Sequence, residues 1–287
     1  MRLMRYEDVF VYGILSPMDD WFKDEKGFKE ASGYEIDGIW FPRVTKILSI
    51  KAKPALYRYY GEAASYKAAQ EVTQKSAEEG TLMHETIQKI MLGENPDVDP
   101  SIAAAVTETR KFLDDRNIQV ESEYIEKRVV HRGERYAGTI DALALIDGKV
   151  GVMDIKTSQA IYRDYNLQTA AYMEPLQESV KNLATRWILR IDQNQICSRC
   201  GASRRVKGGR EKIKFVRGNG RGIPNGTIYP SRSACPEDSH EWSEVRGVIE
   251  LKEFPFWKGD FAAFLSAKKL WEWENEYWLK KIGYRTS

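Results

Sequence analysis

The sequence has only three cysteines among its 287 residues, and it has no uninterrupted apolar run of the length that a membrane span needs, about 18 residues. The amino-terminal residues Met-Arg-Leu-Met-Arg-Tyr-Glu also lack the apolar stretch of a signal peptide. We therefore expect a cytoplasmic protein, in a bacterial or phage-infected cell. Three cysteines cannot form a disulfide framework in a chain of this length.

The net charge is small as well, because 44 Lys and Arg residues stand against 42 Asp and Glu residues, for a formal charge of +2. The overall charge therefore gives no reason to expect a nucleic-acid partner. The charge is unevenly placed, however, since residues 199–232 include ten basic side chains and one acid, Glu211. The basic residues are Arg199, Arg204, Arg205, Lys207, Arg210, Lys212, Lys214, Arg217, Arg221 and Arg232. This segment is a candidate phosphate-contacting surface.

The rest of the composition is that of a folded protein, with 42% hydrophobic and 30% charged residues, and the length allows one main domain with an insertion. Apolar periodicity predicts helices at 55–78 and 81–92 with Gly80 between them, at 101–116 with Ser101 as the cap, at 166–180 and at 260–281. Residue type and turn signals predict a short strand near Trp40, an antiparallel meander at 119–130, 135–145 and 149–155, and strands at 187–191 and 248–253. Other residues before 50 are expected to be irregular.

Asp147-Gly148 between two β-rich runs is a strong hairpin signal, because a two-residue type I′ turn needs positive φ at both central positions. If these two residues are the loop, paired residue numbers sum to 295, and Asp141 lies directly opposite Asp154. Their Cβ atoms would then be about 4.5 to 5.5 Å apart on one face. Lys156 shares that face by strand alternation.

Two carboxylates at that distance repel each other unless a proton or a cation lies between them. Oxygen ligands suit magnesium or manganese, and such an ion can polarise a phosphate while the lysine orients or deprotonates an attacking water. The pattern thus favours a hydrolytic metal site at Asp141, Asp154 and Lys156. On spacing alone, a solvated salt-bridge cluster on an exposed face is an equal alternative.

Gly138-Thr-Ile-Asp141 followed by Asp154-Ile-Lys156-Thr resembles the core motif of the PD-(D/E)XK nuclease superfamily. Gly80-Thr-Leu-Met-His84 resembles the upstream histidine motif of its RecB-like branch, and Gln168 with Tyr172 resembles the downstream Gln-x-x-x-Tyr helix. The order and spacing also resemble those of mitochondrial genome maintenance exonucleases and related phage exonucleases. The resemblance covers residues 42–180, and Ile140 stands where the motif's name has proline.

The resemblance implies an α/β fold, with a restriction-endonuclease-like core in which a mixed central sheet is flanked by helices. It implies that His84, Asp141, Asp154 and the backbone carbonyl of Ile155 bind Mg²⁺ or Mn²⁺, and that Lys156 serves catalysis. Gln168 and Tyr172, an i, i+4 pair on one helix face, would contact the site or the substrate. Ordinary packing of this pair is the alternative.

Cys197-Ser-Arg-Cys200, Cys235 and His240 offer three thiolates and an imidazole, a set that suits tetrahedral structural zinc. We expect residues 193–246 to form a basic, zinc-ribbon-like insertion into a core made of residues 1–192 and 247–287. Unliganded thiols, a thioredoxin-like redox pair and an iron–sulfur cluster are the alternatives. Within the insertion, Arg204, Arg205, Lys207 and Arg210 are the expected DNA-binding residues.

Together these patterns predict a Mg²⁺- or Mn²⁺-dependent deoxyribonuclease that hydrolyses phosphodiester bonds, and the resemblance favours an exonuclease on single strands or duplex ends. DNA is the expected partner, and proteins of recombination or replication are possible further ones. Two other functions stay open: a catalytically silent protein that binds nucleic acid through the insertion, and a structure-specific or RNA-directed endonuclease. Strand polarity and oligomeric state do not follow from the sequence.

Overall fold

A computed structural model describes residues 22–215, 235 and 239–284. Its helices are α2 (Glu25–Ser32), α3 (Val44–Ile47), α4 (Pro54–Glu62), α5 (Tyr66–Met91), α6 (Ala103–Asp115), α7 (Asp164–Leu176), α8 (Lys258–Glu274) and α9 (Glu276–Lys281), with short 3-10 turns η2 (Leu48–Ile50) and η3 (Ser122–Tyr124). Its strands are β1 (Gly33–Ile36), β2 (Ile39–Pro42), β3 (Gln119–Val120), β4 (Arg128–His131), β5 (Tyr136–Thr139), β6 (Ala142–Ile146), β7 (Lys149–Lys156), β8 (Leu183–Ile196), β9 (Ser203–Lys207), β10 (Arg210–Lys214) and β11 (Arg246–Glu253).

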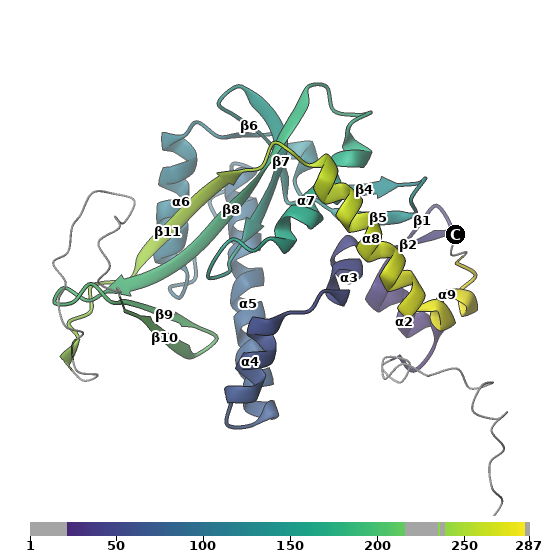
Figure 1. The fold of residues 1–287 in the computed structure, drawn as a ribbon. Helices are drawn as coiled ribbons and strands as arrows, with labels where there is room; N and C mark the ends of the chain where they lie inside the picture. The colour runs from purple at the N-terminus through teal and green to yellow at the C-terminus, as the bar shows by residue number, and fades with distance from the viewer. Residues whose placement is uncertain (1–21, 216–234, 236–238, 285–287) are drawn as a thin grey trace, which may run out of the picture.

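The central sheet has seven strands in the order β10-β9-β8-β7-β6-β3, with β11 paired to β8. It is a mixed sheet, because β7 and β8 run parallel while the other pairs are antiparallel. Helix α7 connects the two parallel strands, as a parallel pair requires a crossover. The predicted α/β class with a mixed sheet flanked by helices is confirmed (Figure 1).

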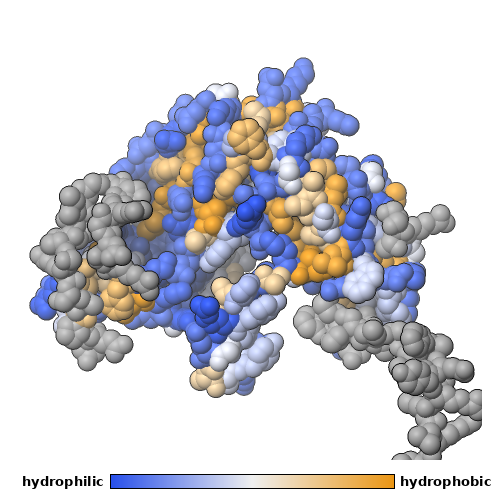
Figure 2. Space-filling model, in the orientation of Figure 1, coloured by the Kyte–Doolittle hydropathy of each residue, from blue (hydrophilic) through white to orange (hydrophobic). Residues whose placement is uncertain are grey.

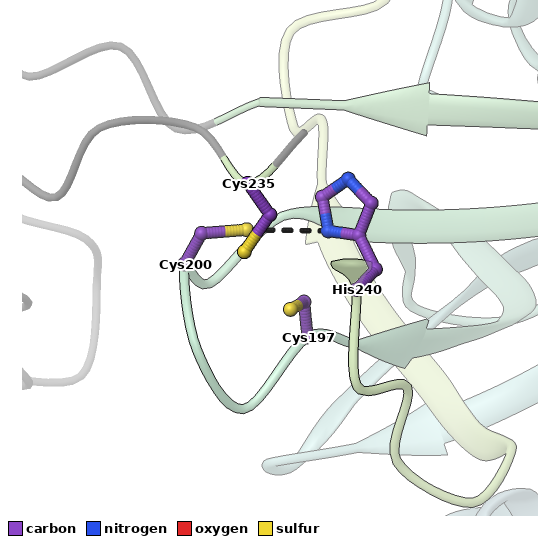
Figure 3. A group of neighbouring side chains, drawn as sticks. All are labelled: Cys197, Cys200, Cys235 and His240. Atoms are coloured by element: carbon purple, nitrogen blue, oxygen red, sulfur yellow. Dashed lines mark hydrogen bonds between the residues drawn. The ribbon is translucent and has the colours of Figure 1, made fainter. Parts of the chain in front are cut away.

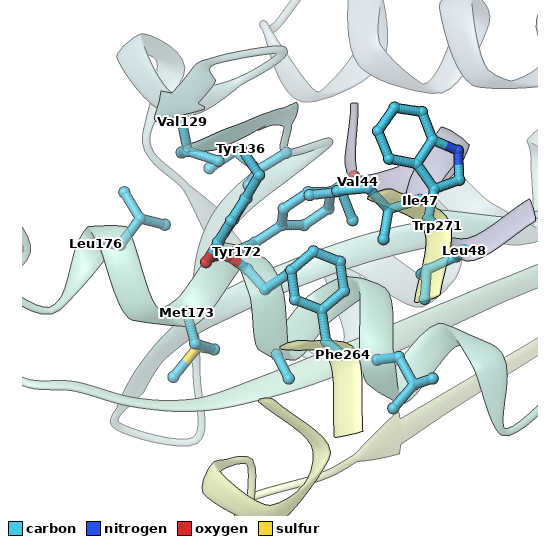
Figure 4. Packing of buried hydrophobic residues seen from close by; sticks show 14 of the residues in the cluster. Val44, Ile47, Leu48, Val129, Tyr136, Tyr172, Met173, Leu176, Phe264 and Trp271 are labelled. Atoms are coloured by element: carbon cyan, nitrogen blue, oxygen red, sulfur yellow. Dashed lines mark hydrogen bonds between the residues drawn. The ribbon is translucent and has the colours of Figure 1, made fainter. Parts of the chain in front are cut away.

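Each face of the sheet buries its own hydrophobic cluster because the side chains of β6 and β7 alternate. Leu143 and Val152 point toward α7 and α8, whereas Met153 and Ile155 point toward α5 and α6. The α7–α8 cluster is rich in aromatic rings, and Figure 4 shows Tyr136, Tyr172, Phe264 and Trp271 packed together there. Two helical layers therefore meet the sheet from opposite sides, which lets α5 and α7 both reach the carboxyl end of β7.

The meander prediction is wrong in one respect, because β4 and β5 form a separate two-stranded sheet rather than joining the central one. The chain leaves β5 at Thr139 and enters the central sheet only at Ala142, so the expected middle strand is two strands. Asp141 lies in the short link between them. The hairpin β6–β7 is as predicted, with Ile146 opposite Lys149 and positive φ at Asp147 and Gly148.

Several helix boundaries also differ from those predicted. The amino-terminal region holds α2, β1 and α3 in addition to the predicted strand at Trp40. Ser101 is not the cap of α6, because Ile102 holds that position and the Ser101 hydroxyl donates to Asp99. The last helix breaks at Asn275, where α8 ends and α9 begins.

Gly80 does not separate two helices but lies within the 26-residue helix α5, and the break falls earlier, between α4 and α5. A Cβ at Gly80 would lie 3.1 Å from Oγ1 of Thr157, so the glycine permits a close approach of α5 to the end of β7. Helix α4 has no buried residue and projects with the start of α5 from the body. Figure 2 shows this projection in blue and pale shades, with few strongly hydrophobic residues.

The described part of the predicted insertion is joined to the central sheet. Strand β9 pairs with the end of β8 through Gln195–Arg204 and Ile196–Ser203, and β10 follows as the next strand outward. Residues 216–234 and 236–238, which include Arg217, Arg221 and Arg232, lie outside the described residues. No helix in the described part of the chain is both long enough and apolar enough to cross a membrane.

Candidate metal and hydrolase site

The two carboxylates predicted from the hairpin register come together at the end of β7. Asp154 is a β7 residue with 1% exposure, and Asp141 lies one residue before β6. Oδ2 of Asp141 accepts a hydrogen bond from the backbone N–H of Ile155 at 2.6 Å. This bond ties Asp141 to β7 beside Asp154 although Asp141 stands outside the strand ladder.

Lys156 lies on the same face as Asp154, as the alternation predicts. Its Nζ is 2.6 Å from Oδ2 of Asp154, and both side chains are largely buried. Gln168 on α7 donates from Nε2 to Oδ1 of Asp154 at 3.0 Å and lies 3.1 Å from the Tyr172 hydroxyl. The predicted pair on α7 thus contacts the carboxylate directly, which places Gln168 in the site and Tyr172 behind it.

Tyr172 is fully buried, and its position depends on a glycine in β5. A Cβ at Gly138 would lie 2.3 Å from the Tyr172 ring, so only glycine lets the ring approach the strand this closely. Gly138 therefore supports the placement of Tyr172 and, through it, of Gln168. Both end residues of the motif Gly138-Thr-Ile-Asp141 therefore have a structural role, because Gly138 leaves room for the Tyr172 ring and Asp141 accepts the hydrogen bond from β7.

His84 enters from the opposite face of the sheet, on α5. Its Nδ1 is 3.9 Å from Oδ2 of Asp141, the carboxylate oxygen that also accepts from the backbone of Ile155. Burial, together with the nearby Lys156 ammonium, lowers the pKa of His84 to about 4. The imidazole is therefore neutral near pH 7, which is the form that binds metal ions.

The carboxylates show the opposite shift. Burial raises the pKa of both Asp141 and Asp154 to about 6, although the Lys156 ammonium works against that rise. For Lys156, burial acts to lower the pKa, but Asp154 and Asp141 outweigh burial and raise it. Near pH 7 the centre therefore holds two carboxylates against one ammonium.

These residues fit a divalent cation. Among the described residues, no group donates a well-formed hydrogen bond to the buried Oδ2 of Asp154, whose neighbour is the Lys156 ammonium. Oxygen ligands at Asp141, Asp154 and the Ile155 carbonyl suit Mg²⁺ or Mn²⁺ better than a soft metal, and a neutral imidazole at His84 can complete the set. The excess negative charge at the centre supports the same conclusion.

An open groove of ≈ 510 Å³ runs beside the centre. It is lined by Ser76, Ala77, Gly80, Thr81, His84, Glu85 and Gln88 of α5, with Glu126 and Thr157. Glu126 is an acid that the sequence patterns do not single out. It lies on a loop between η3 and β4, accepts a hydrogen bond from Gln88, and has its pKa raised by burial. Its position follows from tertiary contact, and no local pattern signals it.

The four predicted DNA-binding residues lie on the β9–β10 hairpin, and all have neighbours within the chain. Arg204 bonds Gln195, Arg205 bonds Asp192, and Lys207 donates to Thr157. The guanidinium of Arg210 lies 4.3 Å from the centroid of the Tyr59 ring, which joins the hairpin tip to α4. DNA contact by these residues stays a prediction, and Arg210 is the most exposed of the four.

The predicted cysteine and histidine ligands are also brought together (Figure 3). One ligand atom from each of Cys197, Cys200, Cys235 and His240 lies within 4.8 Å of all the others, so the group could hold a metal ion. Nδ1 of His240 lies 3.4 Å from Sγ of Cys200, which marks Nδ1 as the ligand atom. The His240 ring stacks on Trp242, with centroids 4.6 Å apart.

The turn that carries Cys197 and Cys200 favours the ionised, thiolate form of Cys197. Gly201 has φ of 75°, and the chain closes with Cys197 N–H donating to the Ala202 carbonyl at 2.8 Å. Burial acts to raise the pKa of the Cys197 thiol, but hydrogen bonds from the Cys200 backbone and from His240 outweigh it and lower the pKa to about 6. A thiol that ionises this readily is a good metal ligand.

In comparisons with protein-family models and with curated proteins, nothing matches this chain.

Proposed function

We propose that the chain is a divalent-metal-dependent deoxyribonuclease that hydrolyses phosphodiester bonds. The observation that carries the proposal is the convergence of Asp141, Asp154 and Lys156 at one buried point, with His84 arriving from the opposite face of the sheet. DNA as the substrate, and exonuclease action on single strands or duplex ends, rest on the resemblance to RecB-like nucleases.

In this proposal Asp141, Asp154, His84 and the Ile155 carbonyl hold the cation. A bound Mg²⁺ or Mn²⁺ would polarise the scissile phosphate and neutralise charge that develops on it. Lys156 retains its proton because its pKa is raised, so its ammonium donates hydrogen bonds to the attacking water or to a phosphate oxygen. Gln168 fixes the orientation of the Asp154 carboxylate through the bond to Oδ1.

The test is cleavage of end-labelled linear single- and double-stranded DNA in Mg²⁺, Mn²⁺ or EDTA. We expect metal-dependent degradation by the wild type and its loss in Asp154→Asn and Lys156→Ala. Exposed residues on α6 provide matched controls, because Asp114→Asn and Lys111→Ala make the same chemical changes outside the site. DNA binding without cleavage in every metal would overturn the proposal, and cleavage of closed circles would replace the exonuclease by an endonuclease.

We also propose that the metal held by Cys197, Cys200, Cys235 and His240 is zinc with a structural role. Three thiolates and one imidazole make a closed tetrahedral set, which leaves no open position for catalysis. The histidine in the ligand set argues against an iron–sulfur centre built on four thiolates. The metal would join two segments of the insertion, the one that carries Cys197 and Cys200 before residues 203–234 and the one that carries Cys235 and His240 after them.

A further inference from the structure

The β9–β10 hairpin contacts both elements that carry the proposed catalytic residues. Lys207 at the end of β9 donates from Nζ to the Thr157 carbonyl at 2.5 Å and to Thr157 Oγ1 at 2.8 Å. Arg205 donates to the same carbonyl at 3.2 Å. In the turn that follows Lys207, the N–H of Gly208 donates to the Glu79 carboxylate on α5 at 2.8 Å.

These contacts fall close to the metal-binding residues in sequence. Thr157 directly follows Lys156 on β7, and Glu79 precedes His84 on α5 by little more than one helical turn. The hairpin therefore bridges the strand that supplies the carboxylate and lysine to the helix that supplies the histidine. The spacing between a helix and a strand depends on the groups packed between them, so a bridge at this point constrains where His84 lies.

Two glycines allow the hairpin tip and the end of β7 to approach α5 closely. Gly208 has φ of 60°, and a Cβ there would lie 2.2 Å from Ser76 Oγ and 2.4 Å from the Val72 carbonyl. Gly80 lies against Thr157 Oγ1 and within 4.0 Å of Lys207 Nζ, measured from the position that its Cβ would take. Helix, strand end and hairpin tip thus meet with no room for a side chain at Gly208 and only a tight fit for one at Gly80.

The Lys207 ammonium is directed into this junction. Its side chain is half-buried, and burial, followed by the neighbouring Arg205, lowers its pKa to about 8. Its charge is felt at His84, whose pKa it helps to lower. A lysine used only as a phosphate contact would extend into solvent, whereas this one donates two bonds to the residue after Lys156.

We infer that Lys207 is a positioning residue of the proposed nuclease centre, holding Thr157 against α5 and thereby fixing the spacing of His84 from Asp154 and Lys156. The inference rests on the proposed function for its catalytic consequence. Its structural content is independent, because a fixed spacing between His84 and the two carboxylates also governs how tightly the centre binds a cation in the absence of DNA. In this inference the insertion, through Lys207, helps to set the geometry of the metal centre.

The experiment compares Lys207→Met, Lys207→Arg and the surface control Lys111→Met with the wild type. Mn²⁺ affinity is measured calorimetrically without DNA on zinc-loaded protein, with Asp154→Asn identifying the binding event that belongs to the centre. Cleavage of a single-stranded oligonucleotide gives kcat and KM separately, and thermal unfolding checks that each variant is folded.

We expect Lys207→Met to weaken Mn²⁺ binding about tenfold and to lower kcat about tenfold or more with little change in KM, because supporting contacts typically contribute that much to metal affinity or activity. Lys207→Arg can donate to the same two oxygens and should recover most of both quantities. Lys111→Met should match the wild type. If Lys207→Met fails to fold, Thr157→Val replaces it, since it removes only the hydroxyl acceptor.

Unchanged Mn²⁺ affinity in a folded Lys207→Met would overturn the inference. A raised KM with unchanged kcat and Mn²⁺ affinity would overturn it too and make Lys207 a DNA contact. A wild type that binds Mn²⁺ through Asp154 but cleaves no DNA would refute the proposed function while leaving the Mn²⁺ comparison as a valid test of positioning.

Discussion

The backbone N–H of Ile155 donates to Oδ2 of Asp141 across 2.6 Å, which fixes the first carboxylate of the site to the strand that carries the second. The bond uses one lone pair of Oδ2 and leaves the other carboxylate oxygen of Asp141 for a ligand. The carbonyl of the same residue, Ile155, is the proposed backbone ligand. One peptide segment of β7 therefore organises both acids around a single point.

Replacement of Asp141 by asparagine should stabilise the metal-free protein. Burial raises the pKa of Asp141 to about 6, so its ionised form opposes folding above that pH, and asparagine removes the charge while it can still accept from Ile155. We expect the free energy of unfolding at about pH 8 in EDTA to rise by ~1–3 kcal/mol. Thermal unfolding measures this, with Asp114→Asn as the neutral control.

Magnesium should reverse the order of stability, so that the wild type becomes more stable than Asp141→Asn. Millimolar Mg²⁺ should raise the melting temperature of the wild type, because a cation that binds only the folded state stabilises it, and should leave Asp141→Asn nearly unchanged. A lower melting temperature for Asp141→Asn in EDTA would show that the ionised carboxylate stabilises the fold, which is incompatible with two acids kept together for a cation.

The stability of the metal-free protein should also depend on pH in a defined window. The ordinary pKa of 3.8 is raised to about 6 at both Asp141 and Asp154, so the folded protein binds more protons than the unfolded chain between these values. The free energy of unfolding should therefore fall as pH rises from about 4 to about 6, although the lowered pKa of His84, which leaves the unfolded chain with more bound protons at that residue, offsets part of the fall. Urea unfolding across this range measures it, and in the double variant Asp141→Asn/Asp154→Asn the free energy of unfolding should no longer fall, because only the opposing contribution of His84 remains.

The affinity for the cation should depend on the ionisation of the same two residues, Asp141 and Asp154, but it should increase rather than decrease as pH rises. Below about pH 6 the two carboxylates hold protons that Mn²⁺ must displace, so its affinity should weaken as pH falls, with release of protons on binding. Calorimetry in buffers of different ionisation enthalpy counts those protons. Binding that is independent of pH between about 5 and 8 would place the cation elsewhere.

The site is more predictable from the sequence than the elements around it. Asp141, Asp154 and Lys156 lie near one two-residue turn, and the geometry of such a turn fixes the register by counting. The predicted helix break at Gly80 is wrong because glycine disfavours a helix by only about 1 kcal/mol, which tertiary packing overrides. The reason for this glycine is Thr157, which lies far along the chain, directly after β7, and no local pattern reveals it.

Other features depend on contacts between distant segments and cannot be inferred from local sequence. The bond from Lys207 to Thr157 spans 50 residues, and the bond from Gly208 to Glu79 spans 129. The split of the predicted middle strand into β5 and β6 likewise depends on which partner each half meets. The cysteine cluster is predictable for a chemical reason, since Cys-x-x-Cys with a later cysteine and histidine is a recurrent ligand pattern.

Protein purified without added metal should contain about one equivalent of zinc, which Cys200→Ser should lose. The loss should lower the melting temperature and expose the chain to protease within residues 193–246, because the metal joins segments on either side of a long connection. Ser198→Ala, in the same turn but outside the ligand set, should retain the metal. Elemental analysis that finds iron, or no metal in folded wild type, would contradict zinc.

The basic hairpin residues should divide into two classes when each is replaced by alanine. Arg205 donates from Nε to both oxygens of Asp192, at 2.7 and 2.8 Å, in a mostly buried pair. Arg205→Ala should therefore cost ~1–3 kcal/mol of stability, as expected for hydrogen bonds to a charged partner. Chemical denaturation of the two single variants and the Arg205→Ala/Asp192→Ala double variant would measure the coupling.

Arg210 and Lys214 are exposed on β10, so their replacement should leave stability nearly unchanged and act on DNA affinity. Removal of one side chain that binds a phosphate should reduce the slope of log affinity against log salt by about 0.7 for single-stranded DNA. Fluorescence anisotropy over a range of salt concentrations, with catalytically inactive Asp154→Asn as the background, measures affinity and slope together. An unchanged slope in Arg210→Ala/Lys214→Ala would mean that DNA does not cross this hairpin, and the binding surface would then have to be sought along the α5 groove that leads to His84.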